Sequence, residues 1–124
     1  MPCSITGKTI PIYFDGEREM AASLSEIIEL DIPGLAPGLR MHLHSDGDQM
    51  ISARLRDERC WESYETALPL QHLQTGDVYV DVGANIGYYT LIAAQRVGPQ
   101  GRVIAYEPDD DNFALLQDNV ALNH

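Results

Sequence analysis

Apolar and polar positions alternate along two segments in the first third of the chain. In residues 26–32 (EIIELDI) every second position is apolar, and residues 39–45 (LRMHLHS) repeat the pattern. A period of two indicates strands with one buried face, and the Pro- and Gly-rich residues 33–38 between them are typical of a turn, so the pattern predicts an antiparallel hairpin. Residues 9–14 (TIPIYF) alternate in the same way and precede an Asp-Gly turn, which predicts a further short strand. The apolar positions of the hairpin are Ile28, Leu30, Ile32, Leu39, Met41 and Leu43.

The spacing becomes helical in the middle of the chain. Residues 48–58 (DQMISARLRDE) and 62–73 (ESYETALPLQHL) both carry apolar side chains at intervals of three and four, which predicts two helices. Proline removes a helical hydrogen bond, so Pro69 is expected to kink the second helix or to end its first part. In the first helix the residues at helical spacing are Met50, Ile51, Arg54 and Leu55, behind Asp46 or Asp48 as a candidate cap.

From residue 77 onward strand and helix patterns alternate. Residues 78–82 (VYVDV) and 102–107 (RVIAYE) are rich in Val, Ile and Tyr, and each run is followed by a helical pattern, at residues 88–97 and 111–123. In this β-α-β-α order the two strands lie parallel. Strands this apolar are typical of a doubly wound sheet with helices on both faces. The predicted fold class is α/β.

These patterns divide the chain into three segments. Residues 1–45 form an N-terminal β-hairpin extension, residues 46–76 a helical lead-in, and residues 77–124 the β-α-β-α unit. Two parallel strands are marginal as an independent sheet, and the strand at residues 78–82 has an unpaired edge. An unpaired edge favours pairing with another chain, pairing with the N-terminal hairpin, or aggregation.

Charge and cysteine content narrow the possible partners. The 124 residues carry a net charge of -11, and no cluster of Lys or Arg interrupts the acidic surface. Nucleic acids and anionic membranes are bound by basic faces, so neither is expected as a partner. The sequence has no apolar run long enough to span a bilayer and no signal-peptide pattern. Cys3 and Cys60 form no Cys-x-x-Cys pair, so we expect reduced thiols and a cytoplasmic protein.

Two groups of residues could suggest a metal site. His42 and His44 fall on one face of a strand, but no third ligand has suitable spacing, so no metal site is predicted. The acidic run from Asp109 to Asp111 is better explained by the start of the last helix, where carboxylates cap free amides and complement the helix dipole.

The stretch between the first strand and its helix carries the clearest chemical signal. Asp81 lies in the strand, and Gly83 and Gly87 follow with three residues between them. Glycines at such a turn allow a ligand to approach the backbone, and the amides at the helix N-terminus favour an anion by about 0.3–1 kcal/mol. An acidic side chain beside these amides suits a ligand that carries both an ammonium group and a carboxylate.

Glu107, at the end of the second strand, adds a nucleoside to this ligand. A carboxylate at the same edge of the sheet, twenty residues after Gly87, accepts hydrogen bonds from the hydroxyls of a ribose. A dinucleotide site requires Gly-x-Gly-x-x-Gly, and Asn85 stands where the middle glycine would be, which disfavours the pyrophosphate of NAD. S-adenosylmethionine has the ribose, the ammonium group and the carboxylate.

The chain resembles a known family over residues 46–124. DQMISARLRDERCWESYETALPLQHLQTGD, VYVDVGANIGYYTLIAA and GRVIAYEPDDDNFALLQDNVALN are similar to the FkbM-type S-adenosylmethionine-dependent methyltransferases, a class I group that mostly methylates oxygen. The resemblance implies a loop around the methionine part, a ribose contact at Glu107, an adenine border after it, and a position near the pocket for Trp61 and Glu62. The expected cofactor-binding residues are Glu62, Asp81, Gly83, Ala84, Asn85, Gly87, Tyr88, Glu107, Pro108 and Asp109.

The resemblance also implies what the chain lacks. Class I methyltransferases have a Rossmann-like, seven-stranded sheet, and this sequence contains its first β-α-β-α half, preceded by the hairpin and the helical segment. We therefore expect a truncated enzyme with no assignable catalytic base. The leading hypothesis is O-methylation of a small-molecule or glycan acceptor, at a hydroxyl of a sugar, glycan or natural product. The alternatives are an inactive cofactor-binding or interaction fragment and, less favoured, an NAD-dependent oxidoreductase.

Overall fold

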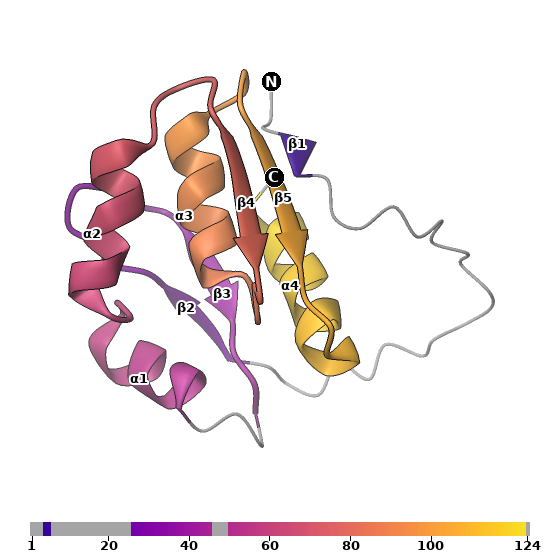
Figure 1. Ribbon diagram of the computed structural model, residues 1–124. Helices are drawn as coiled ribbons and strands as arrows, with labels where there is room; N and C mark the ends of the chain where they lie inside the picture. The colour runs from indigo at the N-terminus through magenta and orange to yellow at the C-terminus, as the bar shows by residue number, and fades with distance from the viewer. Residues whose placement is uncertain (1–3, 6–25, 46–49, 124) are drawn as a thin grey trace.

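The computed structural model describes residues 4–5, 26–45 and 50–123, and Figure 1 shows the arrangement of their elements. These residues form a mixed α/β structure. The strands are β1 (Ser4–Ile5), β2 (Ile27–Glu29), β3 (Arg40–His42), β4 (Val78–Val82) and β5 (Arg102–Tyr106), and the helices are α1 (Ile51–Glu58), α2 (Ser63–His72), α3 (Tyr88–Val97) and α4 (Asp110–Leu122).

The predicted hairpin is confirmed. β2 and β3 pair antiparallel, with Ile28 opposite Met41. The N–H of Leu30 donates to the carbonyl of Leu39, so the pairing continues beyond the strands toward the turn. All six apolar positions named from the alternation are buried, and Leu43 is fully so. The period of two therefore identified the buried face correctly, because successive strand residues point to opposite sides.

The parallel strand pair is also confirmed. β4 and β5 run parallel with Val80 opposite Ile104, and α3 connects them. The second strand ends at Tyr106, so Glu107 is the first residue beyond it. Val82 is paired with Tyr106, and the chain therefore leaves both strands at the same level of the sheet.

A short strand from the N-terminal segment extends this sheet. β1 pairs parallel with β5, with Ser4 opposite Arg102, and the strand order is β1-β5-β4. The sequence pattern did not predict β1, since two residues carry no periodicity. The strand predicted at residues 9–14 lies outside the described residues. β4 stands at the end of the described sheet, as expected, and self-association through its edge stays a prediction.

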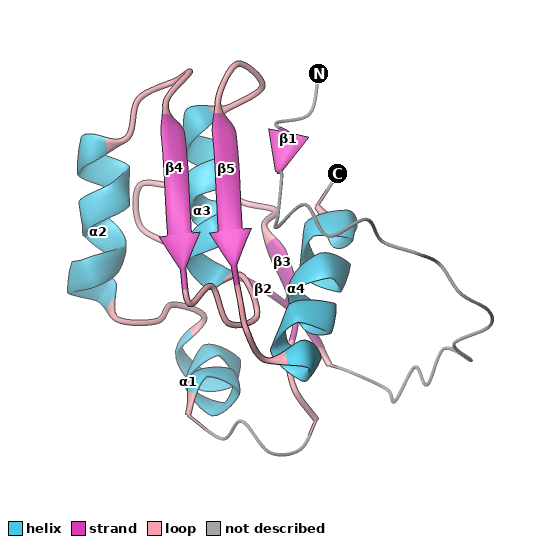
Figure 2. Cartoon of the chain, turned by 45° about the vertical axis from the view of Figure 1, so that its right-hand side comes forward, coloured by secondary structure: helices cyan, strands magenta, loops and turns pink. Residues whose placement is uncertain are grey.

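Helices cover one face of the sheet in the described part of the chain. α3 packs on β4 and β5, and Leu116 of α4 meets Ala105 on the same face. Figure 2 views β4 and β5 from the other side, with α3 behind them. Side chains that point to this side are exposed, Val78 by 63% and Val82 by 80%. The expectation of helices on both faces is therefore wrong for the described residues, because apolar strand composition does not itself supply a covering layer.

The hairpin and the β-α-β-α unit share a hydrophobic core. Its buried members come from the hairpin segment, from α1, and from the start of α3 with the turn before it: Ile28, Leu30, Ile32, Leu39, Met41, Leu43, Leu55, Ile86, Tyr88, Leu91 and Ile92. The hairpin segment and the start of α3 thus bury apolar side chains against each other, which stabilises both segments. The division of the chain into three segments stays a prediction.

The two helices of the middle segment differ from their predicted details. In α1 the buried residues are Ser52 and Leu55, whereas Met50 is 72% exposed and Arg54 lies at the surface, paired with Glu58 at 3.2 Å. The predicted helix is confirmed, and of the residues at helical spacing only Leu55 is buried, because the face that packs inward also contains Ser52. Both candidate caps of this helix lie outside the described residues.

Pro69 does not end α2. The helix continues to His72, and the N–H of Leu73 donates to the carbonyl of Pro69 at 2.9 Å. Proline removes the one hydrogen bond that its own nitrogen would donate, but its carbonyl remains an acceptor for the following turn. No helix among the described residues has the length and apolar character needed to cross a membrane.

Candidate cofactor site at the strand ends

The ends of β4 and β5 are held together by the turn that follows β4. The N–H groups of Gly83 and Ala84 both donate to the carbonyl of Tyr106, at 2.8 and 3.0 Å. These bonds continue the pairing of the two strands for one step beyond the sheet. The residues predicted to bind the methionine part of a cofactor and the carboxylate predicted to bind its ribose are thereby brought to the same edge.

The Glu107 carboxylate spans the gap between the two loops. Its Oε2 accepts the N–H of Asn85 at 2.7 Å, and its Oε1 accepts the N–H of Asp109 at 3.0 Å. Each carboxylate oxygen has a second acceptor direction beyond the amide that it already binds. Glu107 is therefore oriented by backbone amides from both loops while it keeps acceptor capacity for the hydroxyls of a ligand.

Asp81, in β4, is 8% exposed. Its Oδ2 accepts the hydroxyl of Thr90, from the first turn of α3, at 2.5 Å. Burial raises the pKa of the Asp81 carboxyl, and the negative charge of Glu107 raises it further, although the Thr90 hydrogen bond acts in the opposite direction. The burial of Asp81 and the negative charge of Glu107 both disfavour the ionised Asp81 carboxylate. A cationic ligand would offset both effects.

The two glycines of the turn face different surroundings. Both have a positive φ, 79° at Gly83 and 97° at Gly87, which other residues rarely adopt. A Cβ at Gly83 would meet nothing within 4 Å, whereas a Cβ at Gly87 would lie 2.5 Å from Cδ1 of Leu116. Open space for a ligand against the backbone is therefore found at Gly83. At Gly87 the space is filled by α4, so the glycine is required there by packing as well as by its φ.

Asn85 supports the turn from within. It has a φ of 50°, and its side-chain Oδ1 accepts the N–H of Ile86 at 2.8 Å. Asparagine tolerates left-handed backbone better than most residues because its short side chain bonds locally. Its backbone N–H is the one that orients Glu107. Ala84, the neighbouring predicted site residue, is buried against Ala105 and Leu116.

The residues after Glu107 start α4. The Asp109 side chain accepts the N–H groups of Asp111 and Asn112, at 3.1 and 2.9 Å, which confirms the N-cap explanation of the acidic run. Pro108 and Asp109 are exposed beside Glu107, where they can border a ligand that binds this carboxylate.

Tyr88 and Tyr89, which follow the turn, have different roles. Tyr88 is 4% exposed, its hydroxyl accepts the N–H of Trp61 at 3.0 Å and lies 3.1 Å from the hydroxyl of Thr66, and burial raises its pKa. Its side chain thus belongs to the core, and what it presents at the turn is backbone. The hydroxyl of Tyr89 donates to Glu62 at 3.2 Å, and burial raises its pKa to about 12.

Glu62 contacts the helix after the glycine turn through its hydrogen bond with Tyr89. It precedes α2 with a φ of 42°, and Trp61 before it packs partly buried against the core. Glu62 lines a hollow of about 500 Å³ between α2 and β4, together with Tyr89, Tyr79 and apolar side chains of α2. The structure therefore places Glu62 beside the helix that follows the glycine turn.

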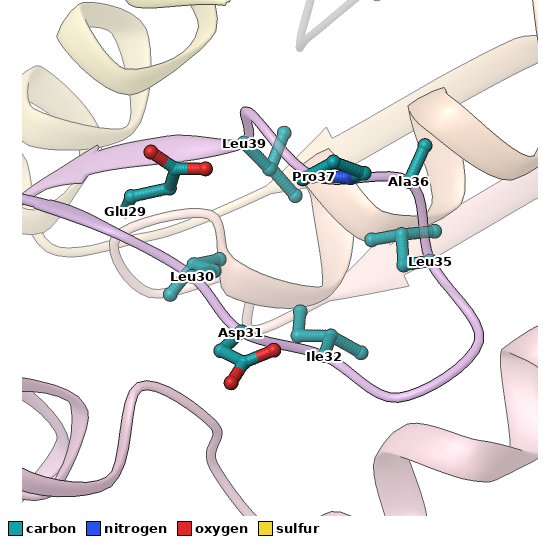
Figure 3. A pocket seen from close by; sticks show the side chains of 8 residues that line it. All are labelled: Glu29, Leu30, Asp31, Ile32, Leu35, Ala36, Pro37 and Leu39. Atoms are coloured by element: carbon teal, nitrogen blue, oxygen red, sulfur yellow. The ribbon is translucent and has the colours of Figure 1, made fainter.

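A second cavity, of about 400 Å³, lies within the hairpin turn. Figure 3 shows its lining, in which Leu30, Ile32, Leu35 and Leu39 surround the space and Glu29 lies at its rim. The Oε1 of Glu29 accepts the N–H of Gly38 at 2.9 Å, so this carboxylate serves the turn itself. The cavity contains none of the predicted cofactor-binding residues.

The histidines considered as metal ligands lie at the packing contact of the hairpin. Nε2 of His44 is 2.8 Å from Oδ1 of Asn112 on α4. The described ranges contain no group of three or more His, Cys, Asp or Glu side chains arranged to hold a metal. Cys60 is not in a disulfide, and its sulfur lies 3.5 Å from the hydroxyl of Tyr88.

Three residues that contact the glycine turn or the end of β4 were not found from the sequence. Thr90 binds Asp81, Leu116 packs against Gly87, and the side chain of Asn119 binds the carbonyl of Ile86 at 2.8 Å. All three residues lie on helices whose apolar spacing predicts which face is buried. The spacing does not predict which atoms a buried side chain contacts.

These features define a class of site: a glycine turn after a parallel strand, with an acidic residue in that strand and another after its neighbour, at the carboxyl edge of an α/β sheet. Such edges bind nucleotide-like cofactors in α/β proteins. Residues 81–124 match the family model of the methyltransferase FkbM domain. The match confirms the resemblance to FkbM-type methyltransferases for the segment from Asp81 through α4, and for residues 46–80 the resemblance stays a prediction. No solved structure matches the chain.

Proposed function

We propose that this chain is the donor-binding part of an S-adenosylmethionine-dependent methyltransferase of the FkbM type, with a hydroxyl of a sugar, glycan or natural product as acceptor. The family match over residues 81–124 supports the methyltransferase class. The arrangement of β4, α3, β5 and α4 is compatible with the first β-α-β-α half of a Rossmann-like class I fold, and we propose this fold class for the methyltransferase.

The observation that carries the proposal is the position of Glu107. Its carboxylate is held by the amides of Asn85 and Asp109, one from each loop at the edge of the sheet. A carboxylate fixed in this way accepts two vicinal hydroxyls without first losing side-chain freedom, which reduces the cost of binding. A glutamate that only capped the surface would need no such support from the turn after β4.

The remaining residues fit the amino-acid end of the same cofactor. Asp81 provides a buried negative charge for an ammonium group, and the open space at Gly83 admits a ligand against the backbone. The first turn of α3, beginning at Tyr88, presents amides toward the same edge and favours a carboxylate. These protein groups therefore match the ribose, the ammonium group and the carboxylate of S-adenosylmethionine.

When bound, S-adenosylmethionine supplies an activated methyl group to an attacking hydroxyl. The residues of this chain would hold and orient the donor, and orientation is worth about 7–11 kcal/mol in well-aligned systems. None of the described residues is assigned as the base that takes the proton of the acceptor.

Calorimetric titration with S-adenosylhomocysteine tests the proposal. The wild-type chain should bind, and Glu107→Ala and Gly83→Val should each lose binding. Gly38→Val is the matched control for the glycine variant, because Gly38 also has a positive φ, of 101°, with open space around it, but lies in the hairpin turn. A wild-type chain that does not bind would contradict a working donor site.

Two further measurements separate the alternatives. A chain that binds S-adenosylhomocysteine but transfers no methyl group to any sugar or natural-product hydroxyl would be a cofactor-binding fragment. Binding of NADH more tightly than of S-adenosylhomocysteine would favour the oxidoreductase. We expect weak NADH binding, because Asn85 replaces the glycine that lets a pyrophosphate approach the backbone.

A further inference from the structure

Asn119 of α4 is a fully buried polar residue that touches the glycine turn. Its Oδ1 accepts the N–H of His42 at 2.6 Å, and its Nδ2 donates to the carbonyl of His42 at 3.2 Å and to the carbonyl of Ile86 at 2.8 Å. Both amide hydrogens therefore have acceptors on two segments that lie far apart in the sequence. One is the edge of the N-terminal hairpin, and the other is the turn after β4.

The bond to Ile86 bears on the geometry of the candidate site. Ile86 lies between Asn85, whose N–H orients Glu107, and Gly87, whose N–H donates to Ala84 at 2.9 Å. Because a peptide group is planar, a bond that fixes the carbonyl of Ile86 also fixes the direction of the following N–H. Asn119 thus determines the orientation of a peptide group in the middle of the turn.

Leu116 strengthens this contact from the same face of α4. Residues three apart are neighbours on a helix, and Leu116 fills the space beside Gly87 while Asn119 binds the preceding residue. The side of the turn that faces α4 is consequently closed by one apolar and one polar contact. Gly83, four residues earlier, has open space instead.

A purely structural explanation of Asn119 is tested by a second asparagine. Asn123 lies one turn further along α4, and its Oδ1 and Nδ2 bind the N–H and the carbonyl of Arg40, at 2.9 and 2.7 Å. Figure 2 shows β3 beside α4. Both side chains thus pair with β3 as a neighbouring strand would, at alternate residues. Asn119 alone of the two also binds the glycine turn.

We propose that Asn119 is a positioning residue for the cofactor turn, through which the N-terminal hairpin is coupled to the donor site. This inference rests on the proposed function in so far as the turn binds a donor. The hairpin then contributes to cofactor affinity although none of its residues was expected to contact the cofactor. The coupling acts through the carbonyl of Ile86.

Asn119→Ala and Asn123→Ala form the matched pair that tests the inference. Both variants lose an amide that pairs with β3, so both should lower the melting temperature. Affinity for S-adenosylhomocysteine is measured by calorimetry well below each melting temperature, where circular dichroism shows the chain to be folded. We expect Asn119→Ala to weaken binding about tenfold, the effect of losing one well-placed hydrogen bond, and Asn123→Ala to leave it unchanged.

Amide hydrogen exchange without any ligand gives a second readout. In Asn119→Ala the amides of residues 85–87 should exchange faster relative to those of α3, and in Asn123→Ala they should not. This comparison still decides the inference if the wild-type chain binds no S-adenosylhomocysteine, an outcome that would contradict the proposed function alone. Equal exchange and equal affinity in the two variants would overturn the role of Asn119. If Asn119→Ala does not fold, Asn119→Ser, which keeps one hydroxyl donor, is compared with Asn123→Ser by the same criteria.

Discussion

The two ends of the glycine turn between β4 and α3 differ in what they contact. At Gly83 a Cβ would meet nothing within 4 Å, and the N–H of Asn85, two residues on, orients Glu107. At Gly87 a Cβ would lie 2.5 Å from Cδ1 of Leu116, and Asn119 binds the carbonyl of Ile86. A single five-residue stretch, GANIG, therefore forms a candidate ligand surface and a closely packed interior contact.

The difference shows why identical residues in one motif need separate explanations. Both glycines have a positive φ, so both satisfy the same backbone requirement. At Gly83 the lack of a side chain leaves room outside the protein, and at Gly87 it leaves room for α4. A side chain at Gly87 should therefore mainly lower stability, and a side chain at Gly83 should mainly lower ligand affinity.

Gly87→Ala should have the largest effect on stability. The added methyl group meets Cδ1 of Leu116 at 2.5 Å, and alanine is strained at a φ of 97°. We expect the free energy of unfolding to fall by about 2–4 kcal/mol, measured by urea denaturation. Leu116→Ala in the same chain should offset part of this loss, and a strictly additive double variant would contradict the packing explanation.

Glu107→Ala should cause the second-largest loss of stability and should strongly reduce affinity for S-adenosylhomocysteine. The amides of Asn85 and Asp109 lose their acceptor, which should lower the free energy of unfolding by about 1–2 kcal/mol. Glu29→Ala is the control, because Glu29 also accepts one backbone amide across a turn, from Gly38. If both variants retained wild-type affinity in calorimetry, Glu107 would have no part in binding.

Gly83→Ala should lower stability only slightly and should clearly weaken binding of S-adenosylhomocysteine. Its φ of 79° strains alanine by about 1 kcal/mol, but the new methyl group meets nothing within 4 Å. Gly38→Ala should cost a similar amount, since Gly38 combines a φ of 101° with equally open surroundings. Only Gly83→Ala should weaken S-adenosylhomocysteine binding, and equal affinities in thermal-shift titrations of the two variants would argue against a ligand surface at Gly83.

Asp81→Asn should have the smallest effect on stability. Unlike the other substitutions, it should leave stability unchanged or raise it. Burial raises the pKa of Asp81 above the ordinary value of 3.8, so ionisation costs stability as the pH rises from that value, and the cost is complete above the raised pKa. Asparagine removes that cost and can still accept the hydroxyl of Thr90. We expect an unchanged or higher melting temperature at neutral pH, with weaker S-adenosylhomocysteine binding.

The pH dependence of binding provides the check on Asp81. A ligand ammonium group prefers the ionised carboxylate, so wild-type affinity should rise as the pH rises through the raised pKa of Asp81. The Asp81→Asn variant should lack this rise. Asp77→Asn is a suitable control, because Asp77 also accepts a hydrogen bond, from Gln74, just before β4. A rise that persisted unchanged in Asp81→Asn would exclude Asp81 as its source.

Elements with strong local patterns were predicted well. The hairpin, β4 and α3 were identified because alternation and helical spacing reflect how each element buries one face. The position of Asp81, Gly83 and Glu107 at one edge of the sheet was predicted because the order of strand, turn and helix brings the ends of parallel strands together, and their part in cofactor binding stays a prediction. These inferences need only the chain's own order and periodicity.

Other features depended on contacts between distant segments. The pattern did not indicate that β1 would join β5, that α1 would turn Ser52 inward, or that one face of the sheet would remain exposed at Val82. In each case several local arrangements satisfy the same sequence pattern. Packing against the rest of the protein selects one of them.

The sequence by itself determined the hairpin, the helices and the β-α-β-α order, and which residues stand at the ends of β4 and β5. Only the tertiary structure decided that Gly87 faces Leu116 while Gly83 faces open space, and that Asn119 connects the hairpin to Ile86. The physical reason is that hydrophobic periodicity reports whether a position is inward, whereas the partner of an inward group is set by the approach of elements many residues away. Hydrogen bonds and close contacts act over a few ångströms, so they are fixed only when those elements have packed together.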